Sequence, residues 1–302
     1  MTIISLVRTD NRTDGTRRAI ELLKTNPLKG KSVVLKPNFN TDDPAPASTH
    51  NDTLRSLVST LKNMGAGKIT LAERSGPGDT THNFMERKGI FIMAHELGFD
   101  VLDMQAMSKN DWVLFKPVDS HWKDGFLFPR IYREAESVVT TCCLKTHQYG
   151  GHFTLSLKLG VGMVPPGLRD PGGYPYMNEL HSSKFQRQMI AEINTAYSPD
   201  LIVLDGVEAF TDGGPARGKR VQANVMLGGT DRIAIDAVGV AILRHLGTTE
   251  AVSTGKIFEQ EQIKRAAELG LGVKSAKEIQ IVTGDKESET YAVEIRKILA
   301  KG

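Results

Sequence analysis

The sequence predicts an α/β protein built on a mostly parallel, doubly wound sheet with helices on both faces. Short runs of aliphatic and β-branched residues alternate with segments of helical periodicity over most of the 302 residues. This β-α-β-α-β alternation is typical of parallel strands that are connected by helices. Apolar residues make up 40% of the chain and charged residues 24%, which indicates an ordinary folded protein and not a disordered one.

The N-terminal part carries the clearest alternation. An apolar run at 32–36 stops at Pro37, and a stripe of Leu and Val over 51–64 with helical spacing ends at Gly65. The expected strands of this part are 3–7, 32–36, 68–73 and 100–104, and the expected helices are 13–24, 51–64 and 80–97.

The segment Trp112–Phe128 interrupts this rhythm. It contains two Trp, several Phe and Pro, and no helical periodicity. We expect an inserted aromatic- and proline-rich hairpin or small subdomain over 111–130. The chain then forms either a single α/β domain over 1–302 or two intimate lobes, approximately 1–110 and 130–302.

The C-terminal part resumes the alternation with a strong strand signal at 137–145. The stretch 150–176 is rich in Gly and Pro and predicts a long structured loop with a short helix near 153–159. Long loops inside compact domains are often functional. The helices expected after it are 183–197, 231–246, 258–269 and a short terminal helix, and the expected strands are 201–204, 224–227 and 279–282.

Charge and cysteine usage exclude several classes of protein. The formal net charge of +3 is too small to indicate a nucleic-acid partner, since basic and acidic residues are interleaved. Cys142 and Cys143 are neighbours on a predicted strand and point to opposite faces, so they predict neither a mutual disulfide nor a shared metal. The N-terminus lacks the pattern of a signal peptide, and no apolar run approaches the roughly 18 residues of a membrane span. We therefore expect a soluble, cytoplasmic protein with no membrane partner, and a homo-oligomer is compatible with the sequence.

Polar residues follow the apolar runs of four predicted strands. Ligands of open α/β sheets bind outside the carboxyl ends of parallel strands, so these residues predict one shared cleft. The alternative is that each strand simply ends in a polar turn. This alternative accounts for any one strand end more readily than for all four together. The residues are Lys36 and Asn38, Glu73 with Arg74 and Ser75, Lys145 with His147, and Asp205.

The segment 140–147 is the sharpest local signal. Because side chains alternate along a strand, Cys143, Lys145 and His147 share one face. The set could bind a metal ion through Cys143 and His147, or hold an anion with Lys145. We interpret Cys143 as a core residue, and Lys145 and His147 as functional.

Two loops add candidate residues. The pair Gly150 and Gly151 enters a short predicted helix, where free backbone N–H groups can hold an oxyanion. Lys158 follows on that helix, and His181 lies just before the next one, where an exposed loop residue is the alternative. Ser75 opens a turn before a helix and could contact phosphate or carboxylate.

Motifs of several common enzyme classes are missing. The Gly-rich stretch 211–218 lacks the Gly-Lys-Ser/Thr ending of a phosphate-binding loop. No dinucleotide-binding fingerprint follows the first predicted strand, and the chain has no Gly-x-Ser-x-Gly elbow. Nicotinamide-dependent, ATP-dependent and serine-hydrolase interpretations therefore lose support.

Taken in order, these elements resemble the domain of unknown function 362 family over roughly 31–284. The matching stretches are Val34-Leu35-Lys36-Pro37-Asn38, Leu144-Lys145-Thr146-His147, Thr154 to Lys158, His181, Val203-Leu204-Asp205-Gly206, Gly214-Pro215 and Asp231 to Asp236. Many relatives carry an extra ferredoxin-like iron–sulfur domain, but two cysteines are too few for one four-cysteine cluster, so this label does not transfer. The chain departs from the family at Cys142 and Cys143, where Pro is usual, and at Leu159, where Asn is frequent. A fainter similarity to the nickel-dependent lactate racemase group lies in the order Gly150, Gly151, Lys158, His181.

The leading hypothesis is a small-molecule enzyme, an isomerase or oxidoreductase with or without a transition-metal ion, that acts on a small carboxylate or phosphate. Residues expected to hold the anion are Lys36, Asn38, Ser75, Lys145, Lys158, Gly150 and Gly151. His147 and His181 would exchange protons, or would bind a metal ion together with Asp205. Asp236 would orient these groups. The alternative is a non-catalytic accessory protein that handles a metal or an electron carrier, with Trp112–Phe128 either as its docking surface or as an internal hydrophobic subdomain.

Overall fold

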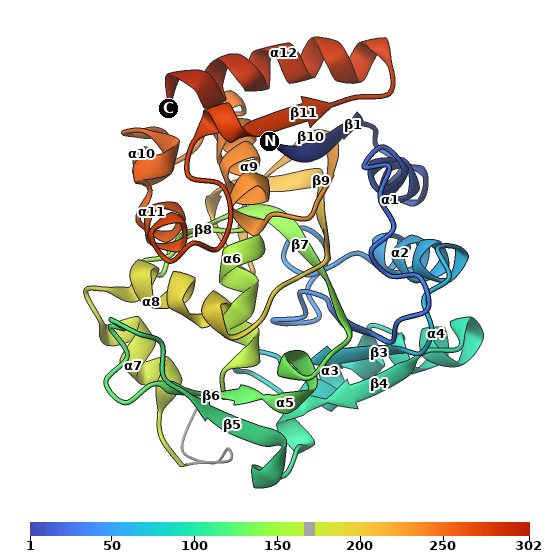
Figure 1. Ribbon diagram of the computed structural model, residues 1–302, viewed down its shortest axis with the longest axis vertical. Coiled ribbons are helices and arrows are strands. Elements are labelled where there is room, and N and C mark those ends of the chain that lie inside the picture. The colour runs from blue at the N-terminus through green and yellow to red at the C-terminus, as the bar shows by residue number, and fades with distance from the viewer. Residues whose placement is uncertain (166–172) are drawn as a thin grey trace.

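A nine-stranded mixed sheet runs through the computed structural model, which describes residues 1–165 and 173–302 (Figure 1). The strands are β1 (Thr2–Arg8), β2 (Val33–Lys36), β3 (Ile69–Glu73), β4 (Asp100–Asp103), β7 (Ser137–His147), β8 (His152–Thr154), β9 (Leu201–Gly213), β10 (Gly218–Gly229) and β11 (Ile279–Val282). Their order is β11-β1-β10-β9-β7-β2-β3-β4, with β8 paired to β7 outside this path. Strand β10 is antiparallel to both of its neighbours, and the run β9-β7-β2-β3-β4 is parallel. The predicted mostly parallel sheet is confirmed.

Helices cover both faces of the sheet, as predicted. One face packs against α1 (Arg12–Glu21), α2 (Asn51–Asn63), α3 (Thr81–Arg87) and α4 (Ile90–Leu97). The other packs against α6 (Ser156–Leu159), α8 (Gln186–Ile193), α9 (Arg232–His245), α11 (Glu261–Glu268) and α12 (Lys286–Lys301). In Figure 1, α1 and α2 lie to the right of the strands, and α6, α8 and α9 lie to the left. Helix α9 is buried on almost every side because its sequence is apolar all round.

The aromatic segment forms a hairpin, as expected. Strands β5 (Trp112–Phe115) and β6 (Phe126–Pro129) make a separate two-stranded sheet. Its Trp122, Phe126 and Phe128 are buried, and they pack with other aromatic side chains such as Tyr197 of the sheet-covering layer. These buried rings form an internal cluster, whereas Leu114 and Val118 of the same segment are exposed. The division into a single domain or two lobes stays a prediction.

Several predicted boundaries were wrong for local reasons. The helix expected over 80–97 is split into α3 and α4, because Gly89 adopts a left-handed backbone conformation with φ of 69°. The helix expected over 183–197 is shorter, and a separate helix, α7 (Tyr176–Ser182), precedes it. The short helix expected near 153–159 is preceded by β8, and part of the predicted 150–176 loop, 166–172, lies outside the described residues.

The strand predicted at 201–204 continues through β9 to Gly213 and returns as β10. The Gly-rich stretch 211–218 is therefore a hairpin connection between two long strands. The terminal helix α12 spans 16 residues and is not short.

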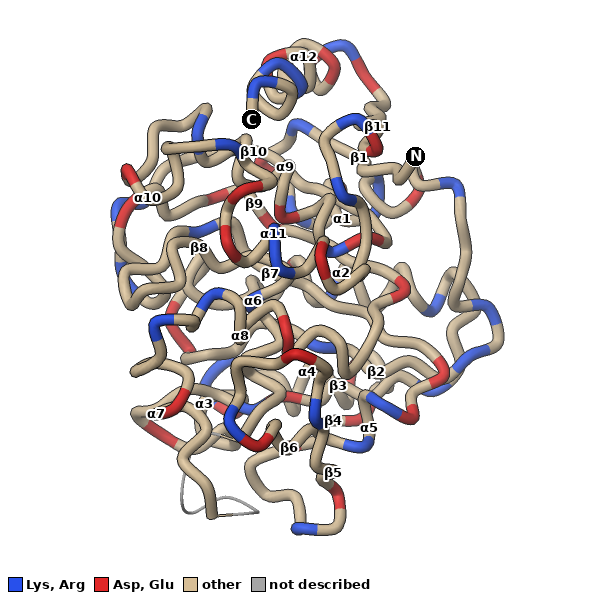
Figure 2. Tube along the Cα trace, turned by 60° about the vertical axis from the view of Figure 1, so that its left-hand side comes forward, with Lys and Arg blue, Asp and Glu red and all other residues tan. Residues whose placement is uncertain are grey.

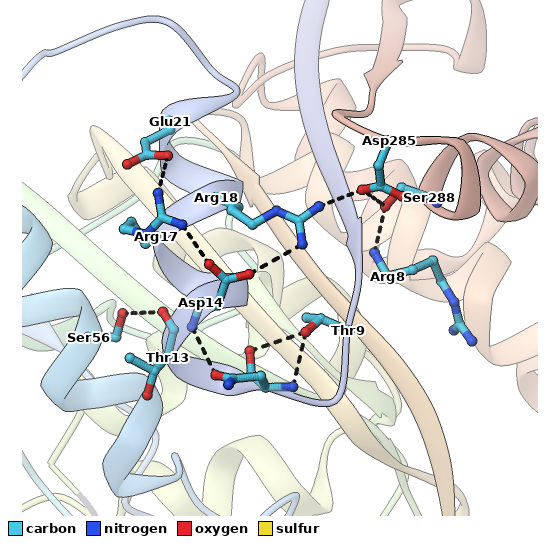
Figure 3. A network of polar contacts seen from close by, with 11 residues as sticks. Arg8, Thr9, Thr13, Asp14, Arg17, Arg18, Glu21, Ser56, Asp285 and Ser288 are labelled. Carbon is cyan, nitrogen blue, oxygen red and sulfur yellow. Dashed lines mark hydrogen bonds and ion pairs between the residues drawn. The ribbon is translucent and has the colours of Figure 1, made fainter.

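The two ends of the chain are joined by polar contacts in addition to the β1–β11 pairing (Figure 3). Arg18 on α1 contacts Asp285 at 2.5 Å, and Asp285 also accepts the backbone N–H of Ser288 as the N-cap of α12. The hydroxyl of Ser288 accepts the backbone N–H of Arg8 at 2.9 Å. These contacts hold the first turn of α12 against α1 and β1.

Charged residues are distributed over the whole trace, with Lys and Arg interleaved with Asp and Glu (Figure 2). None of the helices in the described part of the chain combines the length and the apolar character that crossing a membrane requires. Cys142 and Cys143 are both buried and carry free thiols, which agrees with the interpretation of Cys143 as a core residue.

Candidate functional site

A cavity of about 880 Å³ lies where the carboxyl ends of β2, β3 and β7 meet. This volume is within the range of small-molecule sites. The sequence-predicted residues that line it are Lys36, Asn38, Ser75, Lys145, His147, Lys158 and His181. The structure thus brings together three of the four predicted strand ends, the predicted α6 lysine and the predicted histidine that precedes α8.

Lys36 is neutralised inside this cavity. Its ammonium contacts Glu73 Oε1 at 2.5 Å and donates to the carbonyl of Pro37 at 2.8 Å. The second carboxylate oxygen of Glu73 accepts the backbone N–H of Phe39 at 2.9 Å. Burial lowers the pKa of Lys36, and the Glu73 carboxylate opposes that shift. Lys36 therefore forms a buried ion pair with Glu73, which neutralises the positive charge that a ligand would otherwise contact.

Lys145 has no such carboxylate partner among the described residues. Its ammonium donates to two backbone carbonyls, of Ala47 at 2.5 Å and of Pro215 at 3.2 Å. The side chain is completely buried. Burial lowers its pKa to about 8, and the charges of Cys143, Cys142 and Asp43 oppose only part of that shift.

Among the described residues, Lys158 has fewer hydrogen-bond partners than either of the other two lysines of the cavity. Within the described residues its Nζ has no hydrogen-bond partner, and the side chain is 7% exposed. Burial, with a further contribution from the charge of Lys145, lowers its pKa to about 8. An ammonium with open donor positions in a cavity is available to bind an anion.

Helix α6, which carries Lys158, is held in place by buried polar contacts. Asp236 on α9 accepts the backbone N–H of Ser156 at 2.7 Å and that of Leu157 at 3.2 Å. Asn194 donates to the carbonyl of Leu157 at 2.9 Å. These bonds satisfy backbone groups at the ends of a one-turn helix that could not otherwise be stable. The structure therefore places Asp236 beneath the site, where the sequence predicted a supporting residue.

His147 is held as a neutral ring. Burial lowers its pKa far below the usual range, and the charges of Lys158 and Lys145 lower it further. The backbone N–H of Gly151 donates to Nδ1 at 3.3 Å, which assigns the ring proton to Nε2. His147 therefore offers an N–H donor at Nε2.

His181 has the opposite tautomer. It lies on α7 and not on a loop, and its Nδ1 donates to the carbonyl of Met177 at 2.7 Å. This bond leaves Nε2 with a lone pair. His181 lines the cavity but is an exposed residue, as the alternative prediction had it. Partial desolvation of its ring lowers the pKa of His181, and the charge of Lys158 contributes in the same direction. The two histidines thus present one hydrogen-bond donor and one proton acceptor.

The Gly150–Gly151 segment has a different role from the one predicted. The N–H of Gly151 bonds to His147, so it is not a free donor for an anion. The carbonyl of Gly150 accepts from Arg187 at 2.8 Å, and that of Gly151 accepts from Gln262 at 2.5 Å. A Cβ on Gly151 would lie 2.7 Å from Lys158 Cε, which only glycine avoids. The two glycines therefore pack the loop against His147 and Lys158.

Asp205 does not join this group. The prediction placed it at the end of a short strand, but β9 continues for eight residues beyond it. Its carboxylate accepts from Arg12 at 2.9 Å and from Thr53 at 2.6 Å, on the side of α1 and α2. Among the described residues, no group of three or more His, Cys, Asp or Glu side chains could hold a metal ion. The predicted set of His147, His181 and Asp205 is not assembled.

Two further residues, Thr154 and Gln262, shape the site without having been singled out in the sequence, and a third, Glu73, was singled out without its partner. Glu73 was predicted at a strand end. Its ion pair with Lys36 depends on the parallel register of β2 and β3, which cannot be read from the sequence. Thr154 lies opposite Lys145 in the β7–β8 ladder, and its buried hydroxyl has no partner. Gln262 comes from α11, more than a hundred residues away. No local pattern could have identified Thr154 or Gln262, because both act through tertiary contacts.

Comparisons with known proteins place this chain in a family. The model of the domain of unknown function DUF362 matches residues 33–241, which include all the cavity-lining residues and α9 as far as Ala241. No curated protein matches the sequence. One similar solved structure is that of the lactate racemase apoprotein from Thermoanaerobacterium thermosaccharolyticum, with 14% sequence identity and a TM-score of 0.47. The alignment covers 77% of this chain and 55% of that one, so this chain spans about half the length of the solved structure. Because the family model covers more than half of its residues, the chain belongs to the DUF362 family.

Proposed function

We propose that this protein is a small-molecule enzyme that binds a small carboxylate or phosphate in the cavity and moves a proton on it. The observation that carries the proposal is the Nζ of Lys158, a buried ammonium that faces a cavity and has no hydrogen-bond partner among the described residues. Burying an unpaired charge is costly, and proteins retain such groups where they bind or react. An anionic ligand would remove that cost.

The two histidines supply the chemistry in this proposal. His181, with a lone pair at Nε2, would accept a proton from a carbon next to a carboxylate or carbonyl group of the ligand, and the electron pair of the C–H bond would move onto the oxygen of that group. His147, with its proton at Nε2, would donate a hydrogen bond to the oxygen on which negative charge develops. Lys145 and Lys158 would stabilise the same charge. Proton transfer of this kind is isomerase- or lyase-type chemistry and needs no other group.

A resident transition metal fits these residues poorly. The Nε2 of His147 carries a proton, so it offers a metal no lone pair unless the bond from Gly151 is broken. Asp205 is held by Arg12 and Thr53. The proposal therefore routes no step through a metal ion.

The test is an exchange assay in D2O on the whole chain. Small carboxylates with a C–H bond next to the carboxylate, and phosphate esters with a C–H bond next to a carbonyl group, are incubated with the protein, and loss of that proton signal is followed by NMR. We expect exchange with at least one probe, and a loss of at least about 100-fold in His181→Gln. The matched control is His82→Gln, an exposed histidine outside the cavity, which should exchange at the wild-type rate. The same assay with a chelator and with added divalent metals separates metal-free from metal-dependent turnover. Absence of exchange with every probe would contradict the proposal.

A further inference from the structure

Two ammonium groups share the cavity, and no carboxylate of the described residues is bound to either. Within residues 1–165 and 173–302, the only lysine of the cavity in an ion pair is Lys36, with Glu73. In the same part of the chain, Lys145 has two backbone carbonyls as partners and Lys158 has none. The two lysines therefore leave two positive charges in the cavity that no described carboxylate neutralises.

The acidic residues near these lysines are engaged elsewhere. Asp79 lines the cavity, but its carboxylate accepts from Arg87 at 2.6 Å and from Asn83 at 2.8 Å. Asp43 acts on Lys145 only through its charge, and its carboxylate accepts the hydroxyl of Thr41 at 2.7 Å. Neither acid forms an ion pair with Lys145 or Lys158.

Buried hydroxyl groups add donors to the same cavity. The hydroxyls of Thr154 and Ser75 are buried and have no partner among the described residues, and both side chains line the cavity. Thr154 is 9% exposed and pairs with Lys145 in the β7–β8 register. A buried hydroxyl without a partner is costly, and an anion that accepts from it would satisfy it.

We infer that the ligand of this cavity carries two negative charges close together, as a small dicarboxylate or a phosphate monoester does. Two like-charged ammonium groups in a buried site repel each other, and a single negative charge would neutralise only one of them. A doubly charged ligand would compensate both and would also accept from the hydroxyls. The lowered pKa values of both lysines are consistent with this need. The inference rests on the proposed function and narrows its substrate class.

Isosteric pairs of probes that differ by one charge test the inference. Oxalate is compared with oxamate, and methyl phosphate with methyl sulfate, by calorimetric titration of the full chain near pH 7.5, where the ester phosphate, with a second pKa of roughly 6, is largely doubly charged. We expect the doubly charged member of at least one pair to bind at least about tenfold more tightly. A preference in the first pair alone indicates a dicarboxylate, and a preference in the second alone indicates a phosphate monoester.

Variants connect the preference to the two lysines. Lys145→Met and Lys158→Met should each reduce the preference to about twofold or less, and Lys158→Arg, which keeps the charge, should retain most of it. The matched control Lys264→Met changes an exposed lysine on α11 and should bind as wild type. Thermal melts identify any variant that fails to fold, and the arginine variant then carries the test.

Three results would overturn the inference. Equal affinity within both pairs would mean that the cavity does not distinguish doubly from singly charged anions. The inference would then be wrong, while the proposed function would be unaffected. A preference that persists in the Lys145→Met, Lys158→Met double variant would place the doubly charged ligand elsewhere. Binding of none of the four probes would contradict both the inference and the proposed function.

Discussion

The backbone of Gly151 lies against the ring of His147, with its N–H donating to Nδ1 across 3.3 Å. A methyl group on this glycine would lie 2.9 Å from the same nitrogen and 2.7 Å from Cε of Lys158. One residue without a side chain therefore fixes the tautomer of the histidine and leaves room for the lysine. The contact explains why a glycine is needed here on packing grounds.

Gly151→Ala should disturb the site more than the fold. We expect a loss of about 1–3 kcal/mol in the free energy of unfolding from overpacking, and a reduction in anion affinity of at least about tenfold. The control is Gly284→Ala, whose new methyl group would meet only the end of the Leu22 side chain at 3.2 Å, far from the cavity. Chemical denaturation and calorimetric titration with oxalate measure the two effects. Wild-type affinity in Gly151→Ala would show that the contact does not matter for binding.

Lys158→Met should stabilise the protein while it weakens anion binding. The pKa of Lys158 is lowered to about 8, so the unfolded chain binds more protons than the folded one between about pH 8 and 10.4. The charged lysine therefore destabilises the folded state below pH 8, and this cost disappears as the pH rises through that window. We expect the variant to gain about 1–2 kcal/mol at pH 7 and to approach wild type at pH 10. A variant that is less stable than wild type at pH 7 would contradict this account.

Anion binding should weaken with rising pH. Lys145 and Lys158 are both protonated below a pKa of about 8 and lose their charge above it. The affinity for oxalate, which stays fully ionised, should be constant from about pH 6 to 7 and should fall at least about tenfold between pH 8 and 10. Titrations in buffers with different heats of ionisation should show proton uptake on binding near pH 8. An affinity that rises with pH would exclude the lysines as the binding groups.

Gln262 should act on the site through the Gly151 loop. Its side chain donates to the carbonyls of Gly151 at 2.5 Å and of Phe153 at 3.4 Å. We expect Gln262→Leu to cost about 1–3 kcal/mol in stability and to change the 15N chemical shifts of His147, because the donor to Nδ1 loses its support. The control is Gln260→Leu. Gln260 is also buried and bonds to the carbonyls of Ala251 and Thr254, so it should cost similar stability without moving the His147 signals.

Asp236 should make stability depend on pH in the acidic to neutral range. Burial raises its pKa to about 8, against about 3.9 in an unfolded chain. The folded state then binds more protons between about pH 4 and 8, so this group's contribution is greatest below pH 4 and is lost as the pH rises through 8. Asp236→Asn keeps the acceptor for the Ser156 and Leu157 N–H groups and should flatten the decline of the melting temperature from pH 5 to 8. An unchanged slope would show that Asp236 is ionised throughout.

The alternation of strands and helices, the hairpin at Trp112 and the main polar residues of the cavity could all be predicted from the amino-acid sequence. This was possible because apolar periodicity reports burial, and because parallel strands bring their carboxyl ends to one edge. Lys36, Lys145 and His147 line the cavity for that reason.

The hydrogen-bond and ion-pair partners of these side chains could be identified only in the folded structure. Glu73 forms an ion pair with Lys36, and Arg12 of α1 forms one with Asp205. Gln262 of α11 donates a hydrogen bond to the carbonyl of Gly151. These contacts join residues that are 37 to 193 positions apart. No local pattern encodes them, since the free energy that selects each partner comes from burial and charge in the assembled fold. For the same reason the sequence could locate Lys158, but only the fold shows that its Nζ has no partner among the described residues, and the ligand class is argued from that observation.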